Sequence, residues 1–232
     1  MNLSRRETIQ SATAIAALSV AAIRATPAAA QAAAAAPEVL AETRLRTIAA
    51  LPLQADGSAV EYSQSEAGPI DGVLWKTKGT PDIEFDYRKM KVKVDGRGTS
   101  KLSGTLTFAD LEKLPPRSQI TLLQCGAVKP HGIVKWTGVR FSDFAAAMGA
   151  QSFANYARFT ASDDYYLDED MKTLMHPQVM LAWLANDAPL PPQNGAPLRL
   201  VVPFRYGARS VKAITSIQFT ATSFPPQKGW AA

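Results

Sequence analysis

The stretch "PLPPQNGAPLRLVVPFRYGARSVK", Pro189–Lys212, alternates between segments that favour turns and segments that favour a strand. "PLPPQNGAP" is rich in proline and glycine and predicts a turn, whereas "LRLVVP" predicts a strand and "FRYGARSVK" a loop. Asn194 and Arg199 stand across this turn, and the loop ends at Lys212. Exposed backbone N–H groups with an Asn, an Arg and a Lys are suited to binding a phosphate, although each cluster alone is more often a solvated surface patch.

Several other segments predict short strands. Alternation in "KMKVKVDGRG" indicates a strand that turns at Asp95-Gly96, and "SQITLLQC" is an apolar strand that runs into Cys125. "YARFTAS" and "AITSIQFTAT" also predict strands. The apolar run Val179–Ala185 is expected to be buried, but its periodicity does not decide between strand and helix. The acidic "DDYYLDED" predicts a solvated loop.

Two short helices are expected between these strands. In "TLTFADLEKLPP", Thr107 is the expected N-cap, with Asp110 three residues on and two prolines at the end. In "SDFAAAMG", Ser142 is the expected N-cap and Gly149 the closing residue. Because helices and strands mix without a βαβ rhythm, the predicted fold class is α+β, with mixed or antiparallel sheets and short helices.

Length and composition are those of one globular domain. The 232 residues are 47% hydrophobic, which is sufficient for a buried core. The formal net charge of +5 is scattered along the chain, and part of it belongs to the arginines of residues 1–30. No basic stripe interleaved with aromatic residues is present, so we expect no nucleic-acid partner.

The N-terminus resembles an export signal. A charged "MNLSRRETIQ" precedes a short apolar stretch and the small residues Ala28-Ala29-Ala30, which is the order of a secretory signal rather than of a membrane-spanning helix. "SRRETI" is similar to a twin-arginine signal, although Thr8 stands where a Phe is usual. We expect residues 1–30 to direct export to the periplasm, 31–80 to form a tail and wrapping segment, and 81–232 to form the domain. A longer disordered tail is the alternative for the Ala-rich start.

Cys125 is the only cysteine of the chain. An unpaired thiol in an exported protein is a buried small hydrophobic residue, a metal ligand or a nucleophile. The twin-arginine route carries proteins that are already folded, which favours a thiol that is already bound. His131 follows in the next loop, so a Cys–His pair is conceivable, whereas zinc is disfavoured because no second cysteine is available. His176, before Pro177, is expected to be structural.

The thiol and the phosphate-binding segments together indicate an anionic cofactor that bears a metal. "LLQC", "WTGV", "ARFTASDDYY" and "HPQVMLAWLANDAPLPPQNGAPLRLVVPFRYGARSVKAITSI" resemble the molybdopterin-binding domain of the sulfite oxidase family, over Lys91–Thr222. The chain is particularly similar to the periplasmic branch that reduces methionine sulfoxide in proteins. The resemblance implies a sulfite-oxidase-type fold and a molybdenum-molybdopterin cofactor (Mo-MPT). It also implies that Cys125 ligates the metal, in keeping with the affinity of soft metals for sulfur.

The resemblance assigns cofactor contacts to further residues. Thr160 matches a threonine that contacts the pterin, although it is equally well an ordinary strand residue. Asn194 and Arg199 match the pair that holds the cofactor. The loop that wraps the pterin and its phosphate is matched by Ser210, Val211 and Lys212.

The residues after the cysteine depart from the family. Sulfite oxidases carry a basic pair in "CxGNRR", whereas this chain has "CGAVKPH". Lys129 and His131 are therefore candidates for catalytic residues that shape the substrate pocket, with loop packing as the alternative. Sulfite oxidases favour His where Asn194 stands, which favours the sulfoxide-reducing branch, while "GARSVK" is closer to the sulfite-oxidising branch.

The function implied by this resemblance is oxygen-atom transfer on a sulfur-oxo substrate, with sulfoxide reduction slightly favoured over sulfite oxidation. The substrate is either a small sulfur-oxo compound or oxidised protein methionine. One cysteine cannot supply the Cys-x-x-Cys-His motif of a c-type haem, so we expect a separate haem or cytochrome redox partner. The alternatives of another class are a non-catalytic molybdopterin-binding module and a cofactor-free thiol hydrolase that uses Cys125 and His131.

Overall fold

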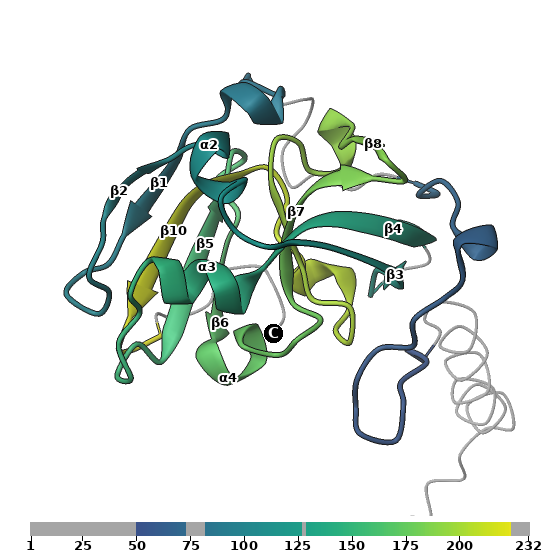
Figure 1. The fold of residues 1–232 in the computed structure, drawn as a ribbon. Coiled ribbons are helices and arrows are strands. Elements are labelled where there is room, and N and C mark those ends of the chain that lie inside the picture. The colour runs from purple at the N-terminus through teal and green to yellow at the C-terminus, as the bar shows by residue number, and fades with distance from the viewer. Residues whose placement is uncertain (1–49, 73–81, 127–128, 224–232) are drawn as a thin grey trace, which may run out of the picture. The chain divides into compact units, whose positions relative to one another are not determined.

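The computed structural model describes residues 50–72, 82–126 and 129–223. The expected signal at 1–30 lies outside these residues. The described strands form two sheets, and Figure 1 shows one of them on the left of the view and the other at the centre and right. One sheet is mixed and the other is antiparallel. Together with short helices, they confirm the predicted α+β class.

The mixed sheet has the strand order β2-β1-β10-β5-β6. Its one parallel pair joins β1 to β10, so the first and last strands of the described domain lie side by side. The other pairs are antiparallel. The strands of this sheet are β1 (Val92–Asp95), β2 (Gly104–Leu106), β5 (Tyr156–Ala161), β6 (Tyr166–Asp170) and β10 (Ile214–Thr220).

The antiparallel sheet has the order β3-β4-β7-β8, and β9 also pairs with β7. Strands β3 and β4 form a hairpin in register from Pro116 opposite Val139 to Gln124 opposite His131. The connection of this hairpin begins at Cys125. The strands of this sheet are β3 (Pro116–Gln124), β4 (His131–Arg140), β7 (Met180–Ala185), β8 (Ala188–Pro189) and β9 (Arg199–Val201).

The apolar run Val179–Ala185, which the sequence did not assign to strand or helix, contains strand β7. Leu181 and Trp183 belong to the larger core, which includes residues of both sheets, whereas Met180 and Ala182 belong to a smaller core on the opposite face. A strand that is covered on both faces needs apolar residues at successive positions, and its sequence therefore loses the alternation that marks a half-exposed strand. The larger core contains an aromatic cluster formed by Phe141, Phe144, Phe159 and Phe219.

The helices are short, as expected. In α2 (Phe108–Leu111), the Asp110 carboxylate accepts hydrogen bonds from the Thr107 backbone N–H at 3.0 Å and from its hydroxyl at 2.7 Å, which confirms the predicted cap. The N-cap predicted at Ser142 is wrong. Helix α3 (Phe141–Ala147) starts directly after β4, with Arg140 as the N-cap. The remaining short elements are α4 (Met171–Leu174) and the 3-10 turns η1 (Gln64–Glu66), η2 (Tyr87–Lys89), η3 (Pro192–Asn194) and η4 (Gly207–Arg209).

The prediction of a solvated acidic loop at "DDYYLDED" is also wrong. Most of this segment forms β6, and the side chain of Glu169 is only 2% exposed. Two arginines neutralise two of its carboxylates. Arg158 donates to Asp168 at 2.6 Å, and Arg209 donates to Glu169 at 2.8 Å. Charged residues are found in a buried strand when residues of opposite charge from other elements pair with them. The local composition of a segment does not reveal such partners.

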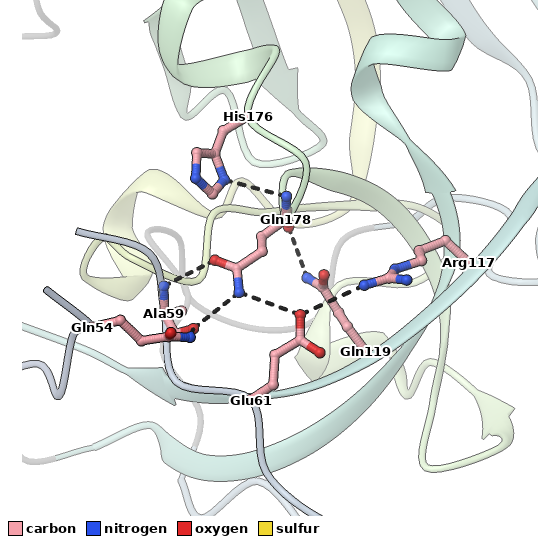
Figure 2. A network of polar contacts seen from close by, with 7 residues as sticks. All are labelled: Gln54, Ala59, Glu61, Arg117, Gln119, His176 and Gln178. Atoms are coloured by element: carbon pink, nitrogen blue, oxygen red, sulfur yellow. Dashed lines mark hydrogen bonds and ion pairs between the residues drawn. The ribbon is translucent and has the colours of Figure 1, made fainter. Parts of the chain in front are cut away.

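Residues 54–61 form an arm that lies along β3. Figure 2 shows the side-chain amide of Gln178 bound to the backbone of Ala59 by two 2.9 Å hydrogen bonds, one donated and one accepted. Gln119 donates to the Gln178 carbonyl at 2.7 Å, and Glu61 pairs with Arg117 at 3.5 Å. The arm therefore adds polar contacts to a strand that has only one neighbour, β4, in its sheet.

We expect Gln178→Leu to lower the free energy of unfolding by about 2 kcal/mol, because the buried N–H of Ala59 would lose its partner and its carbonyl would keep only the 3.1 Å hydrogen bond from Gln54. Urea denaturation measures this change. Gln64→Leu, at an exposed glutamine of the neighbouring turn, is the control and should change stability by less than about 0.5 kcal/mol. Equal effects of the two substitutions would contradict a specific role for Gln178.

Candidate functional site

Cys125 lies immediately after β3 and is 8% exposed. Its backbone is fixed on both sides, because its N–H donates to the Pro130 carbonyl at 3.0 Å and its carbonyl accepts from the Gln124 side chain at 3.0 Å. The thiol is free. The hairpin therefore holds a single thiol at a defined position at its end.

Lys129 and His131 lie on the far side of the same connection. The Lys129 ammonium forms an exposed ion pair with Asp71 at 2.9 Å. His131 exchanges two backbone hydrogen bonds with Asp71, at 2.7 Å and 2.9 Å, and is itself exposed. Both residues thus have a packing role with the segment before the domain. Their predicted part in shaping a substrate pocket stays a prediction.

Arg199 is the most unusual charged residue of the site. It is 2% exposed, and its guanidinium stacks on the Trp136 ring, with the central carbon 4.6 Å from the ring centroid. Its hydrogen bonds go to neutral carbonyl oxygens, at 2.7 Å to Asn194 and 3.4 Å to Ser210, and its Nε has no partner. Burial lowers the pKa of Arg199 to about 9. None of the ion pairs found among the described residues includes this guanidinium.

Lys212 brings a second cation to Arg199. The pKa of Lys212 is lowered to about 8, chiefly by burial and also by the positive charge of Arg199, while the charges of Asp163 and Cys125 oppose this shift. Arg199, Asp163 and Cys125 therefore each lie within electrostatic range of Lys212. The Lys212 ammonium also donates to the Gln193 carbonyl at 3.3 Å.

Gly195 allows the two cations to approach the turn. Its φ is 114°, and a Cβ built on it would lie 3.0 Å from the Arg199 Cβ and 3.2 Å from the Lys212 Cβ. A side chain here would meet both residues and would also strain the backbone. Asn194, directly before Gly195, contributes its carbonyl rather than its side chain to Arg199.

The predicted cofactor loop is fixed to β9 and to its surroundings. The Ser210 hydroxyl accepts from the Val202 backbone N–H at 3.0 Å, and the Val211 carbonyl accepts from Leu200 at 2.8 Å. A Cβ at Gly207, at the start of η4, would lie 3.6 Å from the Cys125 Cα. The loop thus passes from the thiol to the buried guanidinium.

Thr160 lies one residue before the end of β5 and is half-buried. Its carbonyl accepts from the Thr215 hydroxyl at 3.2 Å, which is a contact within the sheet. The chain reaches the site just beyond it, where the Ser162 N–H donates to the Ala213 carbonyl at 2.9 Å. The structure thus places Thr160 beside the cluster, and its predicted pterin contact stays a prediction.

Sequence reasoning missed three residues of this site: Trp136, Ser162 and Asp163. Ser162 has a buried hydroxyl without a hydrogen-bond partner, and Asp163 is 7% exposed. Trp136 follows the alternation of β4, which marks it as buried but does not show that a guanidinium covers its face. No sequence signal brings Ser162 and Asp163 to Lys212, because the contact depends on pairing between β5 and β10.

The donor set fits an anionic group that brings its own metal. Buried cations are normally paired with a negative charge, and Arg199 has an unused N–H beside Lys212. Among the described residues, no group of three or more His, Cys, Asp or Glu side chains is arranged to hold a metal ion. Cys125 therefore offers a single sulfur ligand, and any metal it binds must obtain its other ligands from elsewhere. In the same part of the chain, no helix is long and apolar enough to cross a membrane.

Comparisons with known proteins point to the same chemistry. The model of the family described as "Oxidoreductase molybdopterin binding domain" matches residues 78–228. The protein-methionine-sulfoxide reductase catalytic subunit of Campylobacter jejuni is 30% identical over 163 residues, which cover 63% of this chain and 53% of that protein. The corresponding subunit of Xanthomonas campestris is 33% identical over 156 residues, covering 60% and 47%. The chain thus spans about half the length of the curated relatives it matches.

A solved structure shares the fold. The sulfane dehydrogenase SoxCD of Paracoccus pantotrophus superposes with a TM-score of 0.55 at 20% identity, over 63% of this chain and 45% of that chain. At this identity the likeness concerns the fold alone, and it confirms the expected sulfite-oxidase type of architecture.

Substitution of Gly195 tests the close approach of the two cations. We expect Gly195→Ala to lower the free energy of unfolding by about 2 kcal/mol, because a methyl group would strain the backbone and displace Arg199 and Lys212. Gly57→Ala is a matched control, since Gly57 also has a positive φ, of 83°, but open space around its Cβ position. If both variants lose equal stability, backbone strain alone explains the effect and the steric argument fails.

The lowered pKa of Lys212 predicts a pH dependence. Between about pH 8 and pH 10.5 the unfolded chain holds a proton on Lys212 that the folded chain has released, so folding stability rises with pH in this range. In the cofactor-free protein, Lys212→Met should remove this contribution and raise stability at neutral pH. Urea denaturation of both proteins at several pH values measures it. Parallel stability curves for the two proteins would contradict the assignment.

Proposed function

The chain belongs to the oxidoreductase molybdopterin-binding domain family, and from this we propose that it is an exported molybdenum-molybdopterin oxidoreductase acting on a sulfur-oxo substrate. The relatives that are named as catalytic subunits of protein-methionine-sulfoxide reductase support sulfoxide reduction as the direction of turnover. Oxidised protein methionine is then the substrate class. Sulfite oxidation is the second candidate, which the "GARSVK" sequence of the loop favours.

The observation that carries this proposal is the buried Arg199. A guanidinium that is 2% exposed, bonded to neutral carbonyls and next to a second cation, is poorly stabilised until an anion binds. A phosphate provides the charge and the acceptor oxygens that such a site lacks. The thiol lies at the other end of the same loop, so one elongated anionic ligand could engage both.

Each predicted residue has a definite part in this scheme. Cys125 would contribute its thiolate to the metal, and Arg199 and Lys212 would neutralise the phosphate. Thr160, Asn194, Ser210 and Val211 would line the pterin, chiefly through backbone groups that are fixed by the strands. Molybdenum, when bound, supplies the change of oxidation state that oxygen-atom transfer requires. The protein orients the group and excludes water from the buried thiol.

The substrate would approach from the side of Lys129 and His131. Both are exposed residues at the end of the hairpin that carries Cys125. The Lys129 ammonium could orient an S=O oxygen only after exchanging its exposed ion pair with Asp71, a pair of small energetic value. His131 is the candidate for moving a proton to the oxygen that leaves the substrate.

Export and electron supply complete the proposal. The sequence of residues 1–30 supports a twin-arginine route to the periplasm, which would deliver the protein with its cofactor in place. A separate haem or cytochrome partner would supply electrons, since a c-type haem motif is impossible with one cysteine. The word "subunit" in the names of the relatives supports such an assembly.

Metal analysis of protein purified after native export tests the proposal. We expect about one molybdenum per chain, lost in Cys125→Ser, because soft metals bind thiolate far better than hydroxyl. Circular dichroism checks that the variant is folded. Metal-free wild-type protein from a host that makes molybdopterin would overturn the proposal, and metal-independent hydrolysis that is lost in Cys125→Ser and in His131→Ala would favour the thiol hydrolase instead. Turnover with methionine sulfoxide or with sulfite then decides the direction.

A further inference from the structure

Glu169 and Arg209 form an ion pair that neither the fold nor the proposed chemistry explains by itself. The Glu169 side chain is 2% exposed, and the Arg209 side chain is 36% exposed. Arg209 Nε donates to Glu169 Oε2 at 2.8 Å. Burial raises the pKa of Glu169, while the hydrogen bond and charge of Arg209 lower it. A carboxylate this buried depends on its partner, because without Arg209 the positive charge that acts on it would come from Arg205, whose effect on the pKa of Glu169 is smaller.

A second contact joins the same two segments. The Tyr165 hydroxyl donates to the Ala208 carbonyl at 2.9 Å. Tyr165 and Glu169 belong to the hairpin that contains β6, and Ala208 and Arg209 are adjacent residues of η4. Two neighbouring residues of η4 are thus attached to the hairpin, one through its backbone and one through its side chain.

The opposite side of η4 contacts the hairpin end that carries the thiol. A Cβ at Gly207 would lie 3.4 Å from the Leu123 side chain, 3.5 Å from the Gln124 carbonyl and 3.6 Å from the Cys125 Cα. The next residue after η4, Ser210, gives its carbonyl to Arg199 at 3.4 Å. The turn therefore lies between the β6 hairpin on one side and Cys125 with Arg199 on the other.

We propose that Tyr165, Glu169 and Arg209 form a latch that positions η4 against Cys125, and so controls both access to the thiol and retention of the cofactor. The latch residues are positioning residues, because they act through Gly207 and Ser210 rather than by touching the thiol. The effect of the latch on access to the thiol concerns the cofactor-free protein and is independent of the proposed function. Only its effect on cofactor retention rests on the proposed function.

The sole cysteine makes access directly measurable. Modification of the cofactor-free, full-length protein by an aromatic disulfide reagent reports on Cys125 and on no other residue. We expect Glu169→Gln and Arg209→Met to raise the modification rate about tenfold, because local opening of η4 replaces a closed state. Tyr165→Phe, which removes one hydrogen bond, should give a smaller increase, and Arg209→Lys, which keeps the charge, should stay near the wild-type rate.

Asp168→Asn is the matched control. Asp168 is the neighbour of Glu169 in β6 and forms a similarly buried ion pair with Arg158 at 2.6 Å, and these two residues belong to the paired strands β5 and β6 rather than to η4. It should lower stability, measured by urea denaturation, without raising the modification rate. An equal acceleration in Asp168→Asn, or no acceleration in Glu169→Gln and Arg209→Met, would overturn the latch.

Molybdenum content separates the two parts of the inference. In natively exported protein, Glu169→Gln should contain several-fold less molybdenum than wild type, and Asp168→Asn should contain as much. Faster thiol modification with unchanged molybdenum content would overturn the role in retention. Absence of molybdenum from the wild-type protein would overturn the proposed function and the role in retention, whereas the modification rates would still decide whether the latch exists.

Discussion

The burial of Arg199 without a carboxylate constrains the elements that surround it. Its guanidinium is held by carbonyl oxygens from two separate loops and by the face of Trp136, so both loops and β4 must keep their relative positions for the charge to be tolerated. Backbone hydrogen bonds from Leu200 to Val211 and from Ala213 to Gly195 tie the same loops together. Neutral carbonyls offset only part of the cost of removing a cation from water. The folded protein therefore retains a positive potential at this point.

In such a site, the groups that would bind the ligand lower the stability of the folded protein when the ligand is absent. The groups that would engage an anion are those that disfavour the folded state when the anion is absent: two cations with lowered pKa values and a buried hydroxyl without a partner, that of Ser162. A ligand that binds only the folded state stabilises it in proportion to its affinity and concentration. On the proposed function, cofactor insertion would thus also be a late step of folding, which suits a protein that is exported after it has folded.

The sequence predicted those parts of the fold that depend on local signals. The Thr107 and Asp110 cap, the proline-glycine turn before Arg199 and the strand that ends at Cys125 are each encoded within a few residues. The failures have a common cause. Ser142 is not the N-cap of α3, because β4 runs directly into this helix. Glu169 is buried rather than solvated, because Arg209, 40 residues away, neutralises its charge. The resemblance assigns Asn194 to the cofactor, and that contact stays a prediction; the structure adds that the Asn194 carbonyl supports Arg199. Contacts between distant segments are fixed by sheet pairing, which a single sequence does not reveal.

The arm at residues 54–61 lies outside the segment that matches the family model, yet it contributes contacts to the folded domain. The family model begins at residue 78, after the arm, yet the arm supplies Ala59 and Glu61 to the side of β3, including a bridge between Glu61 and Thr121. A strand at the edge of a sheet presents unpaired backbone groups that can recruit another chain. A chain trimmed to residues 78–228 would expose this edge and would be prone to self-association even though every residue that defines the family was present.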